Sequence, residues 1–328
     1  MYAISYQARK PVIDRCQVHF WSHGGVGEKV SASKPLVMGH EASGIVDHVG
    51  PGVSSLEGGN RVTIEPGYPC RRCNTYKRGQ CNLGPGMKFA ACPPDDHGTL
   101  TRLFKVPEDF CYKLPDNIGL EEGVMVEPLS AAIHAAKAGK IQHGDTVVIL
   151  GSGTIGLLSA AVARAFGAKK VVAVDILEHK LQFARRWNGS NTFMADPGSS
   201  PVNNAHRLVK DNELGLGADV VVEASGAASS ISFGVHTLRP GGSFVQVGVV
   251  GANVDFPIQQ VAERGLHILG SYRYGAGDFQ TALEMLSTKQ IVVKDLISST
   301  VPFEEATVAW EMTKRGQGIK NLIRGAGL

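Results

Sequence analysis

Residues 147–157 read Val-Val-Ile-Leu-Gly-Ser-Gly-Thr-Ile-Gly-Leu, an apolar β-branched run that meets a G-x-G-x-x-G element. A helical pattern follows over Thr154–Phe166, and a second apolar run, Lys170–Asp175, ends in an acidic residue. This order of parts is the one that holds a dinucleotide pyrophosphate at a helix N-terminus. The stretch therefore predicts a nucleotide-binding domain and redox chemistry.

Each glycine of the element has a separate expected task. Gly151 permits the tight turn, Gly153 lets the backbone approach the pyrophosphate, and Gly156 allows the helix to pack closely on the strand. Asp175 lies 19 residues after Gly156, where a carboxylate can accept hydrogen bonds from a ribose diol and repel a 2′-phosphate. This favours NAD over NADP, although Lys180 is near enough to soften the repulsion, and Asp175 could also be a simple helix cap.

Composition excludes several classes of protein. The 328 residues are 43% hydrophobic and 19% charged, as in an ordinary globular protein, and the net charge is only +3. The basic residues cluster in pairs, which makes nucleic acid and anionic membranes poor candidates as partners. No apolar run reaches the roughly 18 residues that a membrane span needs, and the N-terminus lacks the apolar core of a signal peptide. We expect a cytoplasmic protein with no membrane or nucleic-acid partner.

The pattern along the chain predicts two domains. Short apolar runs rich in Gly and Pro over residues 1–126 predict an irregular β-rich domain. Residues 127–271 alternate strands and helices, which predicts an α/β Rossmann domain with a doubly wound parallel sheet. Residues 272–328 do not extend that rhythm and are expected to return to the first domain, which leaves a cleft where a ligand could bind.

Two further segments carry groups that a catalytic Zn²⁺ uses, His40-Glu41 and Glu127-Pro128. Such a pair is weak on its own, because most are a surface charge beside a satisfied histidine. Adjacent residues in a regular strand also point to opposite faces, so His40 and Glu41 could share a metal only at an irregular turn. Pro128 is expected to force Glu127 into an extended conformation.

Several specific segments resemble the zinc-dependent medium-chain dehydrogenases, and within them the polyol branch of sorbitol and xylitol dehydrogenases. The segments are Pro35–Gly44, Glu65-Pro66-Gly67, Pro93-Pro94-Asp95, Phe110–Pro115, Val126–Ser130 and Gly270–Gly275. The resemblance covers nearly the whole chain from about Val18. It implies a GroES-like catalytic domain, a Rossmann domain, NAD and one catalytic Zn²⁺ as cofactors, and a homo-oligomer that is usually a tetramer.

The resemblance also implies roles for individual residues. His40, Glu41 and Glu127 fall on metal-site positions, and Glu127 on the carboxylate that binds or orders the zinc water. Arg273 falls on a catalytic position, and Phe20, Glu127, Arg273 and Tyr274 on substrate positions. The cofactor-binding positions are Gly151, Gly153, Ile155, Gly156, Asp175, Lys180, Val247, Gly248, Tyr272 and Arg273.

The chain departs from the family at its first zinc ligand. Aligned on Val18-His19, Asp14 occupies the place of the ligand cysteine, and Cys16 lies where the family has a serine. Asp14 could be an oxygen ligand, Cys16 could move in after a local shift, or the site is defective. The family also has more residues before this point, so the chain resembles a shortened form whose residues 1–13 cannot replace the first strands, which would leave a sheet edge unpaired.

The second departure concerns the family's optional structural zinc. Cys70 and Cys73 fit its four-cysteine pattern, but Tyr76 and Gly84 occupy the third and fourth places, and Cys81 is three residues early. A closed structural site needs four ligands, so no structural zinc is expected. Together these features predict NAD-dependent, zinc-assisted oxidation of a xylitol- or sorbitol-like polyol to the ketose. The alternative is a non-catalytic NAD-binding variant or partner subunit with a defective zinc site.

Overall fold

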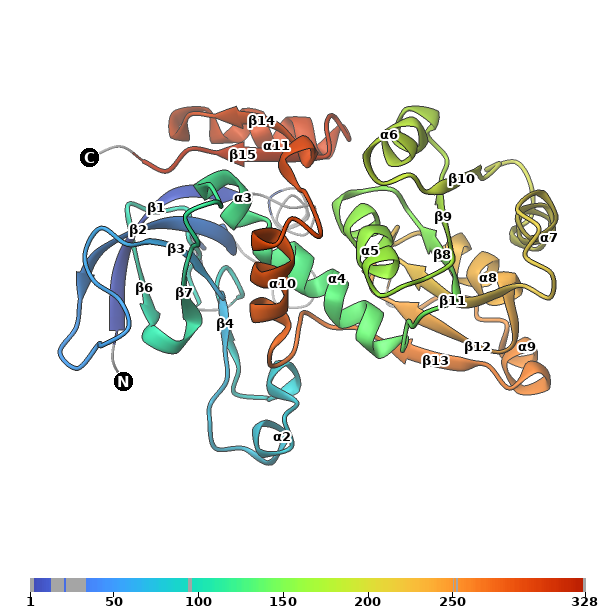
Figure 1. The fold of residues 1–328 in the computed structure, drawn as a ribbon, viewed down its shortest axis with the longest axis horizontal. Helices are drawn as coiled ribbons and strands as arrows, with labels where there is room; N and C mark the ends of the chain where they lie inside the picture. The colour runs from blue at the N-terminus through green and yellow to red at the C-terminus, as the bar shows by residue number, and fades with distance from the viewer. Residues whose placement is uncertain are drawn as a thin grey trace. The chain divides into compact units, whose positions relative to one another are not determined.

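The computed structural model describes residues 3–12, 21, 34–93, 96–249, 251 and 253–326. The chain forms two compact units (Figure 1). The first consists of Met1–Glu127 and Gly275–Leu328, and the second of Pro128–Tyr274.

The second unit is built on a six-stranded sheet in which every pair of neighbours is parallel. Its strands are β8 (Thr146–Leu150), β9 (Lys170–Asp175), β10 (Asn191–Met194), β11 (Ala218–Glu223), β12 (Leu238–Gln246) and β13 (His267–Gly270). They lie in the order β10-β9-β8-β11-β12-β13, so chain order reverses between β8 and β11. The carboxyl ends of strands at such a reversal are where doubly wound folds bind nucleotides.

Helices cover both faces of this sheet, which is why its strands are apolar on both sides. The helices are α4 (Val126–Ala138), α5 (Thr154–Ala165), α6 (Glu178–Asn188), α7 (Pro201–Asp211), α8 (Ala228–Thr237) and α9 (Ile258–Arg264). On one face, Gly234 of α8 lies against Leu150, Val221 and Phe244. On the other, Gly139 at the end of α4 lies against Val220 and Val245, so successive residues of β11 and β12 face opposite layers.

The first unit is built on a seven-stranded sheet and a small two-stranded one. The large sheet has the order β14-β15-β1-β2-β3-β7, with β6 also paired to β1. The strands are β1 (Ala3–Val12), β2 (Glu41–Val49), β3 (Arg61–Ile64), β4 (Gly67–Tyr68), β5 (Lys88–Phe89), β6 (Leu103–Pro107), β7 (Cys111–Lys113), β14 (Ile297–Val301) and β15 (Lys320–Ile323). The helices are α2 (Asn74–Lys77), α3 (Leu120–Val124), α10 (Asp278–Ser287) and α11 (Ala306–Lys314), with short 3₁₀ turns at Cys81–Leu83, Glu108–Phe110, Lys294–Leu296 and Phe303–Glu305.

Strand β1 corrects an expectation from the sequence. It pairs with β2 from Ile4 opposite Val49 to Val12 opposite Glu41, and its other side pairs with β6 and, at Val12, with β15. The sheet edge that was expected to stay unpaired is therefore covered by the N-terminal segment of this chain. The physical reason is that the backbone N–H and C=O groups of β2 need hydrogen-bond partners. A ten-residue extended segment provides them even though its sequence does not resemble the first strands of the family.

The described residues include no helix that is both long enough and apolar enough to cross a lipid bilayer.

A partly buried acid, Glu65, links the end of β3 to β7 and α10. The Tyr112 hydroxyl donates to Glu65 Oε2 at 2.7 Å, and Gln280 Nε2 donates to the Tyr112 oxygen at 3.2 Å. Burial raises the pKa of Glu65 from 4.5 to about 7, an effect that the Tyr112 hydrogen bond opposes and the charges of Asp109 and Asp278 reinforce. Glu65 therefore keeps its proton in the folded protein over a pH range in which it would lose it in the unfolded chain.

The first prediction concerns stability against pH. Between about 4.5 and about 7, only the folded state holds the Glu65 proton, so raising the pH removes stability that is present below that range. The loss is at most about 3 kcal/mol, from the size of the pKa shift. Urea unfolding of the wild type and of Glu65→Gln across this range should show the wild type losing more stability than the variant. Parallel curves for the two proteins would contradict the assignment.

Candidate metal centre and nucleotide-binding site

The nucleotide-binding turn of the second unit joins β8 to α5. Gly151 adopts φ +96°, and a Cβ there would lie 2.8 Å from the Cα of Ser225. A Cβ on Gly156 would lie 1.8 Å from the carbonyl oxygen of Gly151, so the first turn of α5 packs directly on the end of β8. Around Gly153 there is no atom within 4 Å of such a Cβ. Gly151 and Gly156 are therefore required by the turn itself, whereas Gly153 leaves space for a ligand.

Asp175, at the end of β9, supports the same turn. Its Oδ2 accepts a hydrogen bond from the Ser152 N–H at 2.9 Å, and its Oδ1 accepts from Ile176 and Leu177 at 2.8 and 3.1 Å. The side chain thus shapes the turn from which Ile155 and α5 begin, and Oδ2 keeps a lone pair that could accept from a ribose hydroxyl. Lys180 follows in the first turns of α6, where it is partly buried.

A fully buried carboxylate, which sequence analysis missed, organises the neighbouring strand ends. Glu223, the last residue of β11, accepts hydrogen bonds from the Ser225 N–H (2.8 Å), the Ser230 hydroxyl (2.8 Å) and Gln246 Nε2 (2.6 Å). A Cβ on Gly248 would lie 2.5 Å from Glu223 Oε2, so only glycine allows the loop after β12 to run this close to the Glu223 carboxylate. The signal in the sequence was the acidic residue that ends the apolar run Ala218–Glu223.

Val247 and the residues after β13 complete the predicted cofactor positions. The Val247 N–H donates to the Glu223 carbonyl at 2.9 Å. Tyr272 is exposed, and the Arg273 guanidinium lies over its ring at 4.7 Å from the centroid, with Arg273 at φ +58°. Tyr274 is buried at 2% exposure.

The candidate metal centre lies in the first unit, where β2 begins. Gly39, at φ +101°, turns the chain, and a Cβ there would lie 2.7 Å from the hydroxyl of Thr99. Hydrogen bonds from Thr99 to Gly39 and from Leu100 to Met38, both 2.8 Å, hold this turn in place. His40 therefore precedes the regular strand and Glu41 starts it, so the alternation of side chains that would separate them does not apply.

Glu127 reaches the same place from α4. The expectation that Pro128 would hold Glu127 in an extended conformation is wrong, because Glu127 is helical, in the first turn of α4. The N–H groups of a first turn have no partner within the helix, so a proline there sacrifices no hydrogen bond and the helix begins around it.

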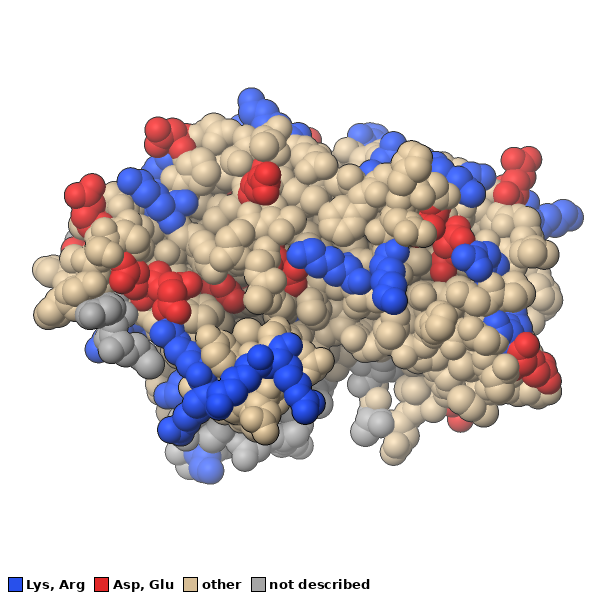
Figure 2. Space-filling view, turned by 60° about the horizontal axis from the view of Figure 1, so that its bottom comes forward, with Lys and Arg blue, Asp and Glu red and all other residues tan. Residues whose placement is uncertain are grey.

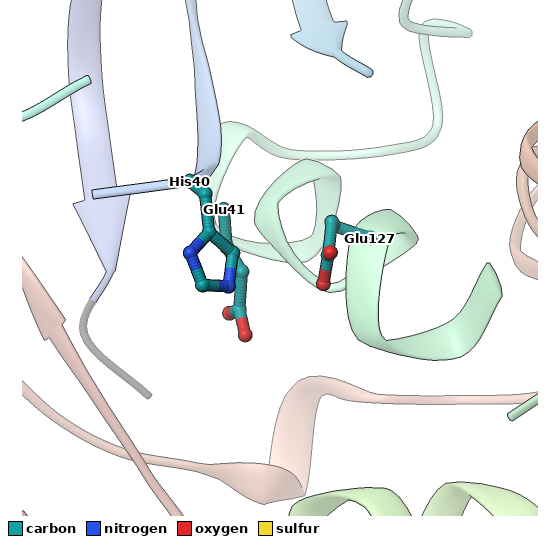
Figure 3. A group of neighbouring side chains, drawn as sticks. All are labelled: His40, Glu41 and Glu127. Carbon is teal, nitrogen blue, oxygen red and sulfur yellow. The ribbon is translucent and has the colours of Figure 1, made fainter. Parts of the chain in front are cut away.

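The three side chains converge. One ligand atom each from His40, Glu41 and Glu127 lies within 4.8 Å of the others (Figure 3). Glu41 and Glu127 are 2% and 7% exposed, and the His40 ring stands 5.3 Å from that of Phe89. Two buried carboxylates beside an imidazole gather negative charge where water cannot screen it, and this donor set is one that Zn²⁺ accepts. The residues present therefore fit a catalytic zinc ion.

Lys320 is a further member of the site that sequence analysis missed. Its ammonium forms an ion pair with Glu41, and the two side chains are 3% and 2% exposed. Lys320 starts the C-terminal strand β15, so it meets Glu41 through the sheet rather than through any local pattern. The signal available was a lysine directly before the short run Asn321–Ile323 that was expected to be a strand. Asp14, Cys16 and Phe20, the other predicted metal and substrate positions, lie outside the described residues.

The second prediction separates the roles of two glycines. Gly153→Ala should leave thermal stability unchanged, because the new methyl group meets no protein atom, but weaken NAD⁺ binding by about tenfold or more where the methyl displaces the pyrophosphate. Gly156→Ala, in contrast, should lower the free energy of unfolding by about 1–3 kcal/mol, because the new methyl group collides with the Gly151 carbonyl oxygen. Calorimetric titration with NAD⁺ and thermal unfolding measure both. Wild-type affinity in Gly153→Ala would contradict the ligand role of this turn.

The third prediction concerns Lys320. Lys320→Met should destabilise the zinc-free protein by about 3–5 kcal/mol, because it leaves the Glu41 carboxylate buried without its cation. Zinc bound at Glu41 would restore positive charge, so the rise in Tm on adding zinc should be larger in the variant than in the wild type. The control is Lys320→Met combined with Glu41→Gln, which removes the buried charge and should recover stability. A zinc response equal in variant and wild type would contradict the shared site.

Comparison with known proteins identifies the family of the chain. Residues 154–288 match the family model described as "Zinc-binding dehydrogenase", and residues 13–116 match "Alcohol dehydrogenase GroES-like domain". A protein of Aspergillus fumigatus named "Probable D-xylulose reductase A" is 48% identical over 309 residues, which cover 94% of this chain and 85% of the relative.

Two solved Escherichia coli structures have the same fold. One is an oxidoreductase of unknown specificity (TM-score 0.91, 28% identity, covering 99% of this chain and 92% of the other), and one is L-idonate 5-dehydrogenase (TM-score 0.87, 27% identity, covering 98% and 91%). The predicted combination of a Rossmann domain with a GroES-like domain is thereby confirmed, as is the resemblance to the polyol branch. The chain belongs to the zinc-binding dehydrogenase family, among relatives that are fungal D-xylulose reductases.

Proposed function

We propose that this protein oxidises a polyol, xylitol-like or sorbitol-like, to the corresponding ketose with NAD⁺ as hydride acceptor and Zn²⁺ as the assisting metal. The observation that carries the proposal is the convergence of His40, Glu41 and Glu127 within 4.8 Å, in a chain that also has the nucleotide-binding turn. The names of its relatives, D-xylulose reductase and L-idonate 5-dehydrogenase, support a polyhydroxylated substrate.

His40, Glu41 and Glu127 would hold the metal. Zinc bound there supplies a Lewis acid that lowers the pKa of a substrate hydroxyl, and NAD⁺ accepts the hydride. Lys320 keeps the Glu41 carboxylate in place and offsets part of the buried negative charge.

Glu127 is the residue we assign to proton transfer. Glu127 is only 7% exposed, and its carboxylate lies beside His40 and Glu41. It can accept the proton that the substrate hydroxyl loses and pass it outward. Arg273 would fix Glu127 and the polyol, and Tyr274 and Phe20 would contact the substrate, as the resemblance implies.

The nucleotide would occupy the carboxyl ends of β8, β9 and β12. Gly151, Gly153, Ile155 and Gly156 would bind the pyrophosphate. Asp175 would receive the ribose hydroxyls and select NAD over NADP, with Lys180 nearby. Val247, Gly248, Tyr272 and Arg273 would border the nicotinamide end.

We further infer the setting in which the protein works. A small-molecule substrate and the lack of any described membrane-crossing helix fit an enzyme of the cytoplasm. The family resemblance favours a homo-oligomer, and within the polyol branch a tetramer.

The fourth prediction is the activity itself. Purified protein should form NADH from NAD⁺ with at least one member of a panel containing xylitol, sorbitol and ribitol, and a zinc chelator should abolish the activity. Glu127→Gln should lower kcat by about 10²–10⁴-fold, the range of a lost acid–base group. The matched control is Glu122→Gln on α3, which keeps an acceptor for the Gly119 N–H and should leave kcat unchanged.

Metal analysis separates the two candidate functions. Zinc near one per chain together with turnover supports the enzyme. Protein that binds NAD⁺, contains no zinc and turns over no polyol would overturn the proposal in favour of the non-catalytic variant.

A further inference from the structure

A small lobe of the first unit, residues 66–93, carries four cysteines that the proposed function does not use, Cys70, Cys73, Cys81 and Cys92. The lobe contains β4, α2, a 3₁₀ turn and β5, with Cys70 and Cys73 before α2 and Cys81 after it. All four thiols are partly exposed and none is in a disulfide. We call residues 66–93 the cysteine lobe.

The turn between Cys70 and Cys73 is held from outside the lobe. Arg71 adopts φ +61°, a left-handed conformation that a non-glycine residue rarely takes. Its guanidinium binds both oxygens of Asp109 at 2.6 Å and lies over the Phe110 ring at 5.6 Å. Such a backbone conformation persists only where neighbouring contacts enforce it, so the spacing of Cys70 and Cys73 is fixed before any reaction.

This turn brings the two sulfurs and their donors together. The Cys73 N–H donates to Cys70 Sγ at 3.4 Å, and the Tyr76 N–H donates to Cys73 Sγ at 3.3 Å. Hydrogen bonds from the backbone of Arg72 and Cys73 and from the Cys73 side chain, together with the Arg72 charge, lower the pKa of Cys70. Burial raises the pKa of Cys81 instead. The Cys70 thiol therefore ionises more readily than that of Cys81.

The lobe is also strongly basic. Residues 66–93 contain no Asp or Glu and five cations, which are Arg71, Arg72, Lys77, Arg78 and Lys88. Figure 2 shows Lys and Arg side chains gathered on the face of the molecule that carries α2. Such a surface attracts anions and raises their local concentration.

We propose that Cys70 and Cys73 are a thiol–disulfide exchange site for a small anionic disulfide such as glutathione disulfide. The Cys70 thiolate attacks one sulfur of glutathione disulfide, which breaks that S–S bond, forms a mixed disulfide at Cys70 and releases one glutathione thiolate. The Cys73 thiolate then attacks Cys70 Sγ, forms the Cys70–Cys73 disulfide and releases the second glutathione. The two protein thiols are oxidised, one glutathione disulfide is reduced to two thiols, and the protons lost by the cysteines go to the glutathione.

The arrangement favours this reaction over metal binding. Among the residues that the structure describes, only His40, Glu41 and Glu127 bring three potential metal-ligand atoms of His, Cys, Asp or Glu within 4.8 Å of one another. The sulfurs of Cys70, Cys73 and Cys81 do not form such a set. Two thiols held by a rigid turn are enough for a disulfide, whereas a closed thiolate metal site needs four ligands.

The fifth prediction tests the pair by mass spectrometry of the full-length protein incubated with glutathione disulfide. The wild type should lose the mass of two hydrogen atoms, and peptide mapping should link Cys70 to Cys73. Cys73→Ser should instead trap one glutathione on Cys70, because the resolving thiol is gone. Cys81→Ser is the matched control and should behave like the wild type. With limiting iodoacetamide, Cys70 should react about tenfold faster than Cys81, reflecting its larger thiolate fraction.

Three results would overturn the proposal. One is first modification at Cys81 rather than at Cys70. Another is a stable glutathione adduct on the wild type with no Cys70–Cys73 link. The third is thiols that react only after a chelator has removed a tightly bound metal, since the pair would then be a metal site. None of these readouts depends on dehydrogenase activity.

Discussion

The first unit depends on how it accommodates buried negative charge. Glu41 and Glu127 place two carboxylates in a volume that water barely reaches, and a buried charge without compensation costs several kcal/mol. The Lys320 ammonium compensates Glu41 directly. Glu127 has a neighbouring imidazole in His40, and the set gains most from a divalent cation. The requirement for positive charge thus connects the end of the chain, the start of β2 and the beginning of α4.

Backbone irregularities, rather than regular elements, bring the chemistry together in both units. At Gly39 a left-handed residue just before β2 releases His40 from strand alternation. At α4 a helix begins around Pro128 and thereby aims Glu127. In the second unit, Gly151 and Gly156 allow a strand and a helix to approach until a single added carbon would not fit. Strands and helices provide rigidity, and the residues at their ends provide the positions.

Local patterns predicted the second unit well and the first less well. The strands β8, β9 and β11 begin and end where the apolar runs do, because strands buried on both faces leave a continuous signal. Lys320 and Glu223 were missed because their partners come together only through the sheets. The role of β1 was missed because a family resemblance does not show whether an unrelated segment can pair with a free strand edge. The grouping of His40, Glu41 and Glu127 was anticipated from the family resemblance, because the two motifs alone are weak evidence, whereas the helical conformation of Glu127 was not anticipated.

The order of strands in the large sheet has a consequence for biosynthesis. Strand β15 follows the second unit in the chain and pairs with β1, which precedes that unit, while the second unit is a single uninterrupted segment between them. Since domains fold as units during translation, the Rossmann segment can complete its core while the first unit still lacks a strand. Glu41 therefore meets its lysine only after the whole Rossmann segment has been synthesised, and until then the sheet of the first unit is incomplete.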